Sequence, residues 1–437
     1  MDADIDRLTL PDKPFYAKSV TDLGDTREIV AAEDIFSEHG IKLVARDSRI
    51  DSGLYERLVL HKLRVPLDRC LSIPHPVDPE TLSAQSGELF DKIPELPTLA
   101  KELSDRFFLR HALSEISLNR ALAFKLTVAR EKFPDLYRHS VLVGLLAAYL
   151  GARAGLPGDE LRALSAAGVF HDLGMMHLDP ALLDPDHKLT GPERRAILSH
   201  PAIGYALLKS FPEYHPKVSH AVLDHHERLN GSGYPRARMA ERIGRLGQIL
   251  ALAEVAASRI GESGCDCSRL EIMLKLNPRL YPLELIGHLS VLFPAPSAPS
   301  AQDAAAASDG VIPARLGALR QSFEDWQDKI GALRTSRDMK PEWERLDGRV
   351  AHLQTALRDA GLLADDAHSL LDGIEVHAAA LAELDALLHE AIWHLRDVAD
   401  EIERIAGIGP PPSGDPACSP LGEWARALRE RLGAVAA

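Results

Sequence analysis

Apolar residues recur every three or four positions through most of this chain, which is the spacing of an amphipathic helix. The pattern is nearly unbroken from residue 99 to residue 294, where one stretch places Val143, Leu146 and Leu150 on a single face. Such faces bury themselves against neighbouring helices. We therefore predict that residues 99–294 form an all-α domain and that the chain as a whole is mainly helical.

The first 98 residues show a weaker and mixed pattern. Residues 34–50 contain two short β-rich runs around a turn, and residues 54–63 have helical spacing. The stretch 74–98 is rich in proline and polar residues, which is typical of a linker. We predict a small N-terminal α+β domain of a regulatory type, followed by a linker, within residues 1–98.

Beyond an alanine, serine and proline stretch, which we interpret as a flexible linker over residues 295–312, the chain becomes rich in heptads. Apolar residues alternate steps of three and four in three runs, over residues 316–333, 343–357 and 381–405. Residues 313–437 are therefore expected to form a helical region. A bundle within one chain and a coiled coil between chains both fit this pattern, and we predict a homodimer through these helices.

The composition limits the classes of partner. A net charge of -14 disfavours binding to long nucleic acid, whose phosphates require a basic surface. No apolar stretch reaches the ~18 residues of a membrane span, and the N-terminus lacks the pattern of a signal peptide. The cysteines fit neither a disulfide framework nor a zinc finger, and are expected to be free thiols in the cytoplasm; they are Cys70, Cys265, Cys267 and Cys418.

Histidines and carboxylates gather in the middle third of the chain. His171 and Asp172 follow the small apolar run LSAAGVF, so that two polar groups are carried toward the interior, where they need partners. His225 and His226 point about 100° apart if they lie on a helix, and can serve two neighbouring ions. These residues, joined by further nitrogen and oxygen donors, supply enough ligands for a two-metal site; the further donors are His139, His200 and Glu254.

The order of these motifs, a histidine, then HD, then a histidine, then HHE followed by GSGYP, resembles the HD-GYP family of metal-dependent phosphohydrolases. The resemblance covers residues 99–294 and implies an all-α domain. It further implies hydrolysis of cyclic di-GMP to pGpG or GMP in bacterial second-messenger signalling. In that family the aspartate bridges two metals and a bridging water or hydroxide attacks phosphorus.

Carried over by position, the resemblance assigns His171 and Asp172 to catalysis and predicts two divalent ions, or three, with Fe or Mn as the expected metals. The implied metal ligands are His139, His171, Asp172, His200, His225, His226 and Glu254, with Asp135 at the position of a third-metal glutamate. The implied rim of the substrate pocket is formed by Gly231, Gly233, Tyr234 and Pro235.

The chain departs from the family pattern at several positions, most of which concern the substrate and one of which is a metal ligand. Met175 stands where a lysine is usual, Asn230 replaces an aspartate, and Glu254 replaces a late aspartate ligand. The Arg-x-Tyr segment that usually follows is missing, and Arg259 is the nearby cation, out of register. Three hypotheses follow. The first is a cyclic di-GMP phosphodiesterase, favoured by the six unbroken His/Asp positions, and the second is a catalytically degenerate domain that binds a ligand or acts as a scaffold, favoured by Met175 and the missing segment. The third, a different HD phosphohydrolase acting on nucleotides, is disfavoured by the GxGYP motif.

Overall fold

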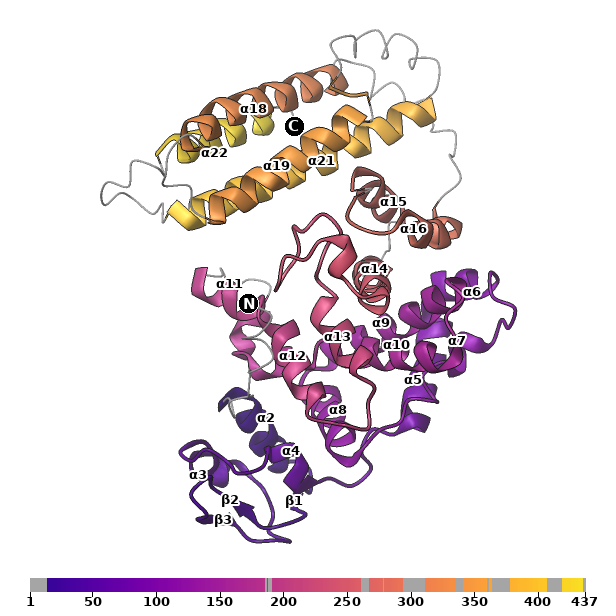
Figure 1. The fold of residues 1–437 in the computed structure, drawn as a ribbon, viewed down its shortest axis with the longest axis vertical. Helices are drawn as coiled ribbons and strands as arrows, with labels where there is room; N and C mark the ends of the chain where they lie inside the picture. Colours follow the sequence, from indigo (N-terminus) through magenta and orange to yellow (C-terminus); the bar gives the residue numbers. More distant parts are fainter. Residues whose placement is uncertain are drawn as a thin grey trace. The chain divides into compact units, whose positions relative to one another are not determined.

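The computed structural model of the chain describes residues 14–184, 187, 191–260, 267–277, 279–293, 311–334, 341–359, 361–363, 378–406 and 419–434. Helices dominate these residues and strands are short and few, which confirms the mainly helical fold (Figure 1). The chain divides into two compact units. The first contains residues 1–265 and 281–292, and the second contains residues 266–280 and 293–437.

The N-terminal part of the first unit combines short helices with two small antiparallel sheets. Strand β1 pairs with β4, with Val30 opposite Ser72, and β2 pairs with β3, with Ile35 opposite Val44. The elements are α2 (Pro14–Gly24), β1 (Val30–Ala31), β2 (Ile35–Phe36), β3 (Lys42–Val44), η1 (Ser52–Leu54), α3 (Tyr55–Val59), α4 (Leu67–Cys70) and β4 (Leu71–Ser72). Helices α2 and α4 both pack on α8 (Arg120–Lys132), so this part joins the helical domain directly.

The structure differs from the expected linker in residues 74–98, because most of this stretch is helical. Helix α5 spans Pro79–Lys92 and α6 spans Glu95–Ala100. Asp78 caps α5 by accepting a hydrogen bond from the backbone N–H of Thr81 at 2.7 Å, and Pro79 occupies the first turn. Proline is compatible with a helix at that position because its missing N–H has no helical partner there. Pro79 therefore marks the start of α5 and is not a sign of a linker.

The remaining helices of the first unit form the scaffold of the histidine cluster. Helices α9, α10, α13 and α14 pack against one another, and α12 packs on α13 and η2. Their bounds are α7 (Phe108–His111), α9 (Pro134–Arg153), α10 (Gly158–Phe170), η2 (Leu173–His177), η3 (Pro180–Leu183), α11 (Gly191–Ile197), α12 (His200–Lys209), α13 (Pro216–Asp224), η4 (Ala240–Arg242), α14 (Arg245–Ile260), α16 (Leu283–Leu289) and η5 (Ser290–Leu292).

Helices α9 and α10 cross at a pair of glycines, where their backbones nearly touch. A Cβ atom built on Gly168 would lie 2.6 Å from the Cα atom of Gly144 and 2.9 Å from its nitrogen. The absence of side chains at both positions lets the helices approach closely enough to bury Val143 and Val169 completely. Because α10 ends at Phe170, this crossing sets the position of His171, the next residue.

The second unit is built from long helices around one apolar core. They are α15 (Cys267–Leu276), α18 (Val311–Arg334), α19 (Pro341–Asp359), α21 (Ala378–Ala406) and α22 (Ser419–Ala434). Heptad side chains from the first two runs, including Trp326 and Trp343, are buried in this core together with Leu395 of the third. Trp326 also packs edge-on against Trp424, with ring centroids 4.8 Å apart. Most of the expected 295–312 linker lies outside the described residues.

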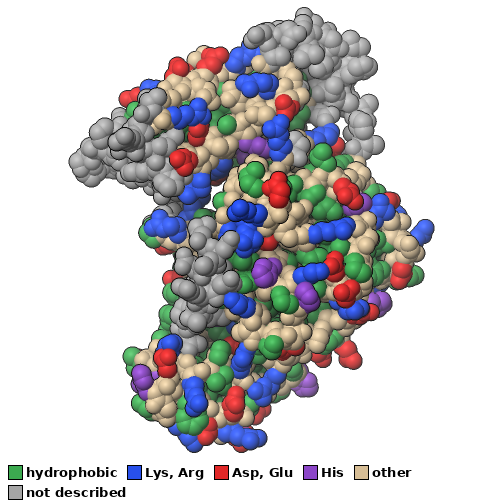
Figure 2. All heavy atoms as spheres, viewed as in Figure 1, with side chains coloured by type: hydrophobic (Ala, Val, Ile, Leu, Met, Phe, Trp, Pro, Cys, Tyr) green, Lys and Arg blue, Asp and Glu red, His purple; other side chains and the backbone are tan. Residues whose placement is uncertain are grey.

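Two further properties bear on the environment of the chain. Cys70 and Cys267 are free thiols, and burial raises the pKa of Cys70 to about 12; Cys265 and Cys418 lie outside the described residues. None of the described helices has the length and apolar character needed to cross a bilayer. On the face shown in Figure 2, acidic and basic side chains are interspersed over both units.

Candidate metal centre

Three histidines of the cluster are oriented by the backbone of the helix ends on which they stand. The Nδ1 atom of His171 lies 2.7 Å from the carbonyl oxygen of Gly168. His200 makes the same contact to the Ile197 carbonyl at 2.7 Å, and His225 makes it to the Val222 carbonyl at 2.6 Å. A carbonyl accepts only, so each Nδ1 carries the proton and each Nε2 presents a lone pair. The three Nε2 atoms converge on one region.

Asp172 lies between two sets of imidazoles. Its Oδ2 atom is 3.2 Å from Nε2 of His171, and its Oδ1 atom is 3.1 Å from Nε2 of His200 and 3.9 Å from Nε2 of His225. The cluster has two halves, one of His139, His171 and Glu254 and the other of His200, His225 and His226. The Asp172 carboxylate faces both halves, which is the arrangement that a ligand shared between two ions requires.

Glu254 of α14 completes the first half. Its Oε2 atom lies 2.9 Å from Nε2 of His139 on α9 and 3.1 Å from Nε2 of His171. A glutamate therefore reaches the cluster at the position where the family pattern has an aspartate. Donor atoms in each of three groups lie within 4.8 Å of one another: His200, His225 and His226; His139, His171 and Glu254; His171, Asp172 and His225.

The donor set fits a metal centre, and one contact in particular indicates a cation. The Nε2 atoms of His200 and His225 face each other at 3.1 Å, although both Nδ1 atoms already hold the ring protons. Two lone pairs at this distance repel unless a positive charge lies between or beside them. Imidazole nitrogen and carboxylate oxygen are the usual ligands of first-row divalent ions. The contact between His200 and His225 is therefore better explained by a bound divalent ion than by a direct interaction of the two rings.

Burial and charge set the ionisation of these groups. Burial lowers the pKa of His225 and His226 well below the ordinary value, helped by the neighbouring imidazoles, so both rings are neutral. Burial raises the pKa of Asp172, but His171 and His200 outweigh it and hold that pKa well below its usual range. Burial also lowers the pKa of His171, and Asp172 and Glu254 reverse that effect. Carboxylates that favour a proton on His171 also favour a divalent cation there.

The position of Asp135 differs from that of the other candidates. It lies on the first turn of α9, about one turn before His139, and its side chain is exposed. Among the residues that the structure describes, it belongs to none of the three donor groups. The other seven candidate ligands all lie within the cluster.

Comparison with known proteins places this geometry in a family. Residues 125–260 match a family described as the HD domain. A cyclic di-GMP phosphodiesterase from Pseudomonas aeruginosa is 34% identical over 132 residues, which cover 30% of this chain and 32% of that protein. This part of the chain is therefore an HD domain, similar to the corresponding part of a cyclic di-GMP phosphodiesterase.

Two further relatives are also named as phosphodiesterases. The cyclic di-GMP phosphodiesterase response regulator RpfG from Xanthomonas campestris is 36% identical over 28% of this chain and 31% of that protein. A 3'3'-cGAMP-specific phosphodiesterase from Vibrio cholerae is 33% identical over 27% of each chain. The alignments thus span about a third of the length of these relatives.

The GYP segment of this HD domain is a loop fastened to the end of α13. His226 stacks on Tyr234, with ring centroids 4.6 Å apart and planes 20° apart, and the Tyr234 N–H donates to the His226 carbonyl at 3.1 Å. A Cβ atom on Gly233 would lie 2.5 Å from backbone atoms of residues 226–228, so only glycine allows this approach. Gly231 adopts a φ of 77°, and the bond between Tyr234 and Pro235 is cis. All four candidate rim residues lie in this loop beside His226.

Two buried carboxylates that the sequence analysis passed over hold the loop in place. The oxygens of Glu227 accept hydrogen bonds from the backbone N–H groups of Arg236 and Arg238 at 2.7 and 2.9 Å. Asp224 pairs with the guanidinium of Arg236, and both side chains are nearly fully buried. The sequence could have pointed to Asp224 and Glu227, because they flank His225 and His226 in the run DHHE.

We expect Glu227→Gln to lower turnover by about 10-fold or more, because an amide group presents one acceptor and one donor to two N–H donors. Metal content should stay at the wild-type value, since Glu227 is outside the donor groups. Glu241→Gln, which makes the same change at an exposed site on η4, is the matched control. Equal turnover in both variants would show that Glu227 does not position the loop.

Two of the departures from the family pattern have visible positions. The Asn230 side-chain oxygen accepts from the backbone N–H of Ser232 at 3.1 Å and from its hydroxyl at 2.7 Å, so this residue shapes a turn that an amide supports as well as a carboxylate. Met175 lies in η2, half-buried, and brings no charge to the region.

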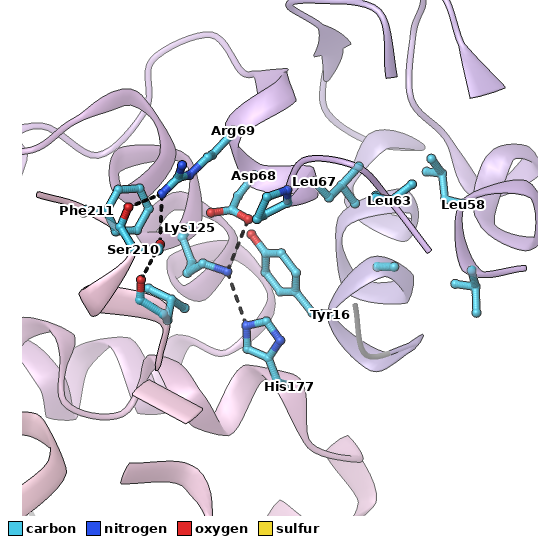
Figure 3. Close-up of a pocket in the computed structure, with 14 residues that line it drawn as sticks. Tyr16, Leu58, Leu63, Leu67, Asp68, Arg69, Lys125, His177, Ser210 and Phe211 are labelled. Atoms are coloured by element: carbon cyan, nitrogen blue, oxygen red, sulfur yellow. Dashed lines mark hydrogen bonds and ion pairs between the residues drawn. The ribbon is translucent and has the colours of Figure 1, made fainter. Parts of the chain in front are cut away.

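A second buried polar cluster lies at the far end of η2 (Figure 3). The ammonium of Lys125 is 3.3 Å from Nε2 of His177, 3.9 Å from Oδ1 of Asp68 and 3.6 Å from the centroid of the Tyr16 ring. These groups line a cavity of about 40 Å³, which has room for a few water molecules and none for a dinucleotide. The cluster connects α2 to the segment that carries Asp172.

Proposed function

We propose that the HD domain of this chain hydrolyses a phosphodiester bond of cyclic di-GMP, or of a related cyclic dinucleotide, to give pGpG and then GMP. The observation that carries the proposal is the placement of Asp172 between two sets of imidazole Nε2 atoms. Two curated relatives have cyclic di-GMP phosphodiesterase in their names, and a third is named for 3'3'-cGAMP, which supports a cyclic dinucleotide as substrate.

The residues present divide between two divalent ions, for which Fe or Mn are the proposed identities. His139, His171 and Glu254 would hold one ion, and His200, His225 and His226 the other, with Asp172 shared. Bound ions of this kind lower the pKa of a coordinated water and neutralise charge on phosphoryl oxygens. As an alternative to two ions, a third ion could bind near Asp135. Its exposed position one turn before His139 leaves that side chain accessible.

The chain's own contribution is to hold these groups still and to keep them in the correct protonation state. Backbone carbonyls fix the rings of His171, His200 and His225, so these rings need no reorientation when an ion arrives. The loop of Gly231, Gly233, Tyr234 and Pro235 would form the rim against which the substrate lies. Tyr234 offers an aromatic face beside His226.

Turnover and metal content measured together test the proposal. Protein purified without chelators should contain about two equivalents of a first-row metal and should convert cyclic di-GMP to a linear product with added Mn²⁺ or Fe²⁺. Removing the metal should abolish turnover, and adding it back should restore turnover. Parallel assays with 3'3'-cGAMP would define the preferred substrate. Metal-loaded protein that binds cyclic di-GMP in calorimetry without forming product would instead support the degenerate, ligand-binding alternative.

The flanking regions are proposed to regulate the HD domain. We propose the division at residues 98, 294 and 312, a cytoplasmic location, where cyclic dinucleotide messengers act, and a homodimer through the helices of residues 313–437. Many of the heptad side chains are buried within one chain, so a dimer would use an outward surface such as Trp393 on α21, whose exposed fraction is 54%. A monomeric mass in light scattering at high protein concentration would contradict the dimer.

A further inference from the structure

The proposed substrate is an anion, and this chain lacks the usual cations for it. Met175 replaces a lysine, and the family's Arg-x-Tyr segment is missing after Ser258. A diester phosphate in a partly buried site is held best by a cation, and guanidinium suits it because its planar fork can donate two parallel hydrogen bonds. The structure therefore has to supply a positive charge from another position.

Most arginines of the GYP loop are engaged elsewhere. The guanidinium of Arg236 is buried in its pair with Asp224. Arg238 donates through NH1 to the backbone carbonyl of Arg242 at 3.0 Å. The buried Asp224 carboxylate pairs with Arg236 and also interacts electrostatically with Arg238, so both of these charges are compensated by a carboxylate.

Arg228 is placed differently. It stands two residues after His226, and its guanidinium carbon lies 5.0 Å from the ring centroid of Tyr281, near the start of α16. Its NH1 donates to the backbone carbonyl of Glu227 at 2.8 Å. Within the described residues, no carboxylate forms an ion pair with this guanidinium, so its charge is held in position by an aromatic ring and a backbone carbonyl and is not neutralised there.

The positive charge of Arg228 affects the pKa of His226, a candidate metal ligand, and that of Tyr234, a candidate rim residue. Burial and His200 lower the pKa of His226, and the positive charge of Arg228 adds to that effect. Burial and Asp172 raise the pKa of Tyr234, and Arg228 opposes that rise. The backbone brings the same segments together, because a Cβ atom on Gly233, next to Tyr234, would lie 2.5 Å from the backbone nitrogen of Arg228.

We propose that the Arg228 guanidinium binds a phosphate oxygen of the cyclic dinucleotide, in the role that the missing lysine and Arg-x-Tyr segment would fill, and that Tyr281 is its positioning residue. This inference rests on the proposed function. It assigns substrate binding to a cation within the HHER run, beside the stacked pair of His226 and Tyr234.

The test measures binding without turnover. The probe is a hydrolysis-resistant phosphorothioate analogue of cyclic di-GMP, titrated into Mn²⁺-loaded full-length protein. Arg228→Gln should weaken its Kd by roughly 10- to 100-fold, the size expected when one charged hydrogen-bonding partner is lost. Arg228→Lys, which keeps the charge without the fork, should fall between that variant and wild type. Metal content should equal that of wild type in both variants.

Two further variants complete the design. Arg242→Gln makes the same change at an exposed arginine and should bind like wild type. Arg259→Gln tests the competing cation near the end of α14. If Arg259→Gln loses affinity and Arg228→Gln does not, the inference is overturned.

The remaining outcomes separate this inference from the function on which it rests. If Arg228→Gln lowers the melting temperature and leaves Kd unchanged, Arg228 only caps α13 and the inference is wrong. If Arg228→Gln does not fold, Arg228→Lys decides: weaker binding at a wild-type melting temperature supports the inference, and wild-type affinity with wild-type KM in that variant overturns it. Should wild-type protein neither bind the analogue nor cleave cyclic di-GMP, the proposed function fails and the inference fails with it.

Discussion

Asp172→Ala will remove bound metal and lower turnover by at least about 1,000-fold, the upper end of the loss seen when one transition-state contact is deleted. The effect is large because this carboxylate faces both halves of the cluster, through Oδ2 toward His171 and through Oδ1 toward His200. Its loss also leaves buried imidazoles without their counter-charge. Elemental analysis and a turnover assay on the same preparation measure the two consequences.

The matched control is Asp159→Ala, which removes an exposed carboxylate from the first turn of α10, the helix that leads to His171. It should keep both metal and turnover. Asp172→Ala protein that retains two equivalents of metal and wild-type turnover would show that the cluster is not the catalytic centre.

Gly168→Ala will destabilise the first unit by about 1–3 kcal/mol, the usual cost of overpacking, and will reduce metal content at the same time. The new methyl group would lie 2.6 Å from the Cα atom of Gly144, so the backbones of α9 and α10 must separate. The carbonyl of Gly168 is also the acceptor for Nδ1 of His171, so the displacement reaches a ligand directly. Thermal unfolding and elemental analysis of one preparation report both effects.

Gly158→Ala, at the start of the same helix, is the control for that experiment. A Cβ atom there meets only the terminal nitrogen of Arg162 at 3.5 Å, an ordinary contact. An unchanged melting temperature for Gly168→Ala would mean that the two helices tolerate a wider separation than their packing indicates.

The sequence was sufficient for the fold class and for the set of residues that meet in the cluster. His171 and Asp172, His200, and the pair His225 and His226 stand at helix ends, and fixed motifs of this kind carry their own local geometry. His139 and Glu254 were also expected at the site by position, and the structure places Oε2 of Glu254 2.9 Å from Nε2 of His139 and 3.1 Å from Nε2 of His171.

Contacts between residues that are far apart in the sequence could not be predicted from the sequence patterns. Tyr281 meets Arg228 from more than fifty residues away, and no local pattern announces such a contact. The helix in residues 79–92 was hidden by its prolines, one of which occupies the first turn. Heptads predict that helices pair without saying with which partner, and here Trp326 meets Trp424 of the same chain.

The carbonyl contacts of His171, His200 and His225 have a consequence for how such a domain changes over time. Each ring takes its orientation from the main chain, and none of these three contacts uses a neighbouring side chain. Side-chain changes that leave the main chain in place can therefore accumulate nearby while the imidazoles keep their direction. Met175 in η2 and Asn230 in the loop after His226 lie outside these three contacts, so the side chain at either position can differ without turning a ring.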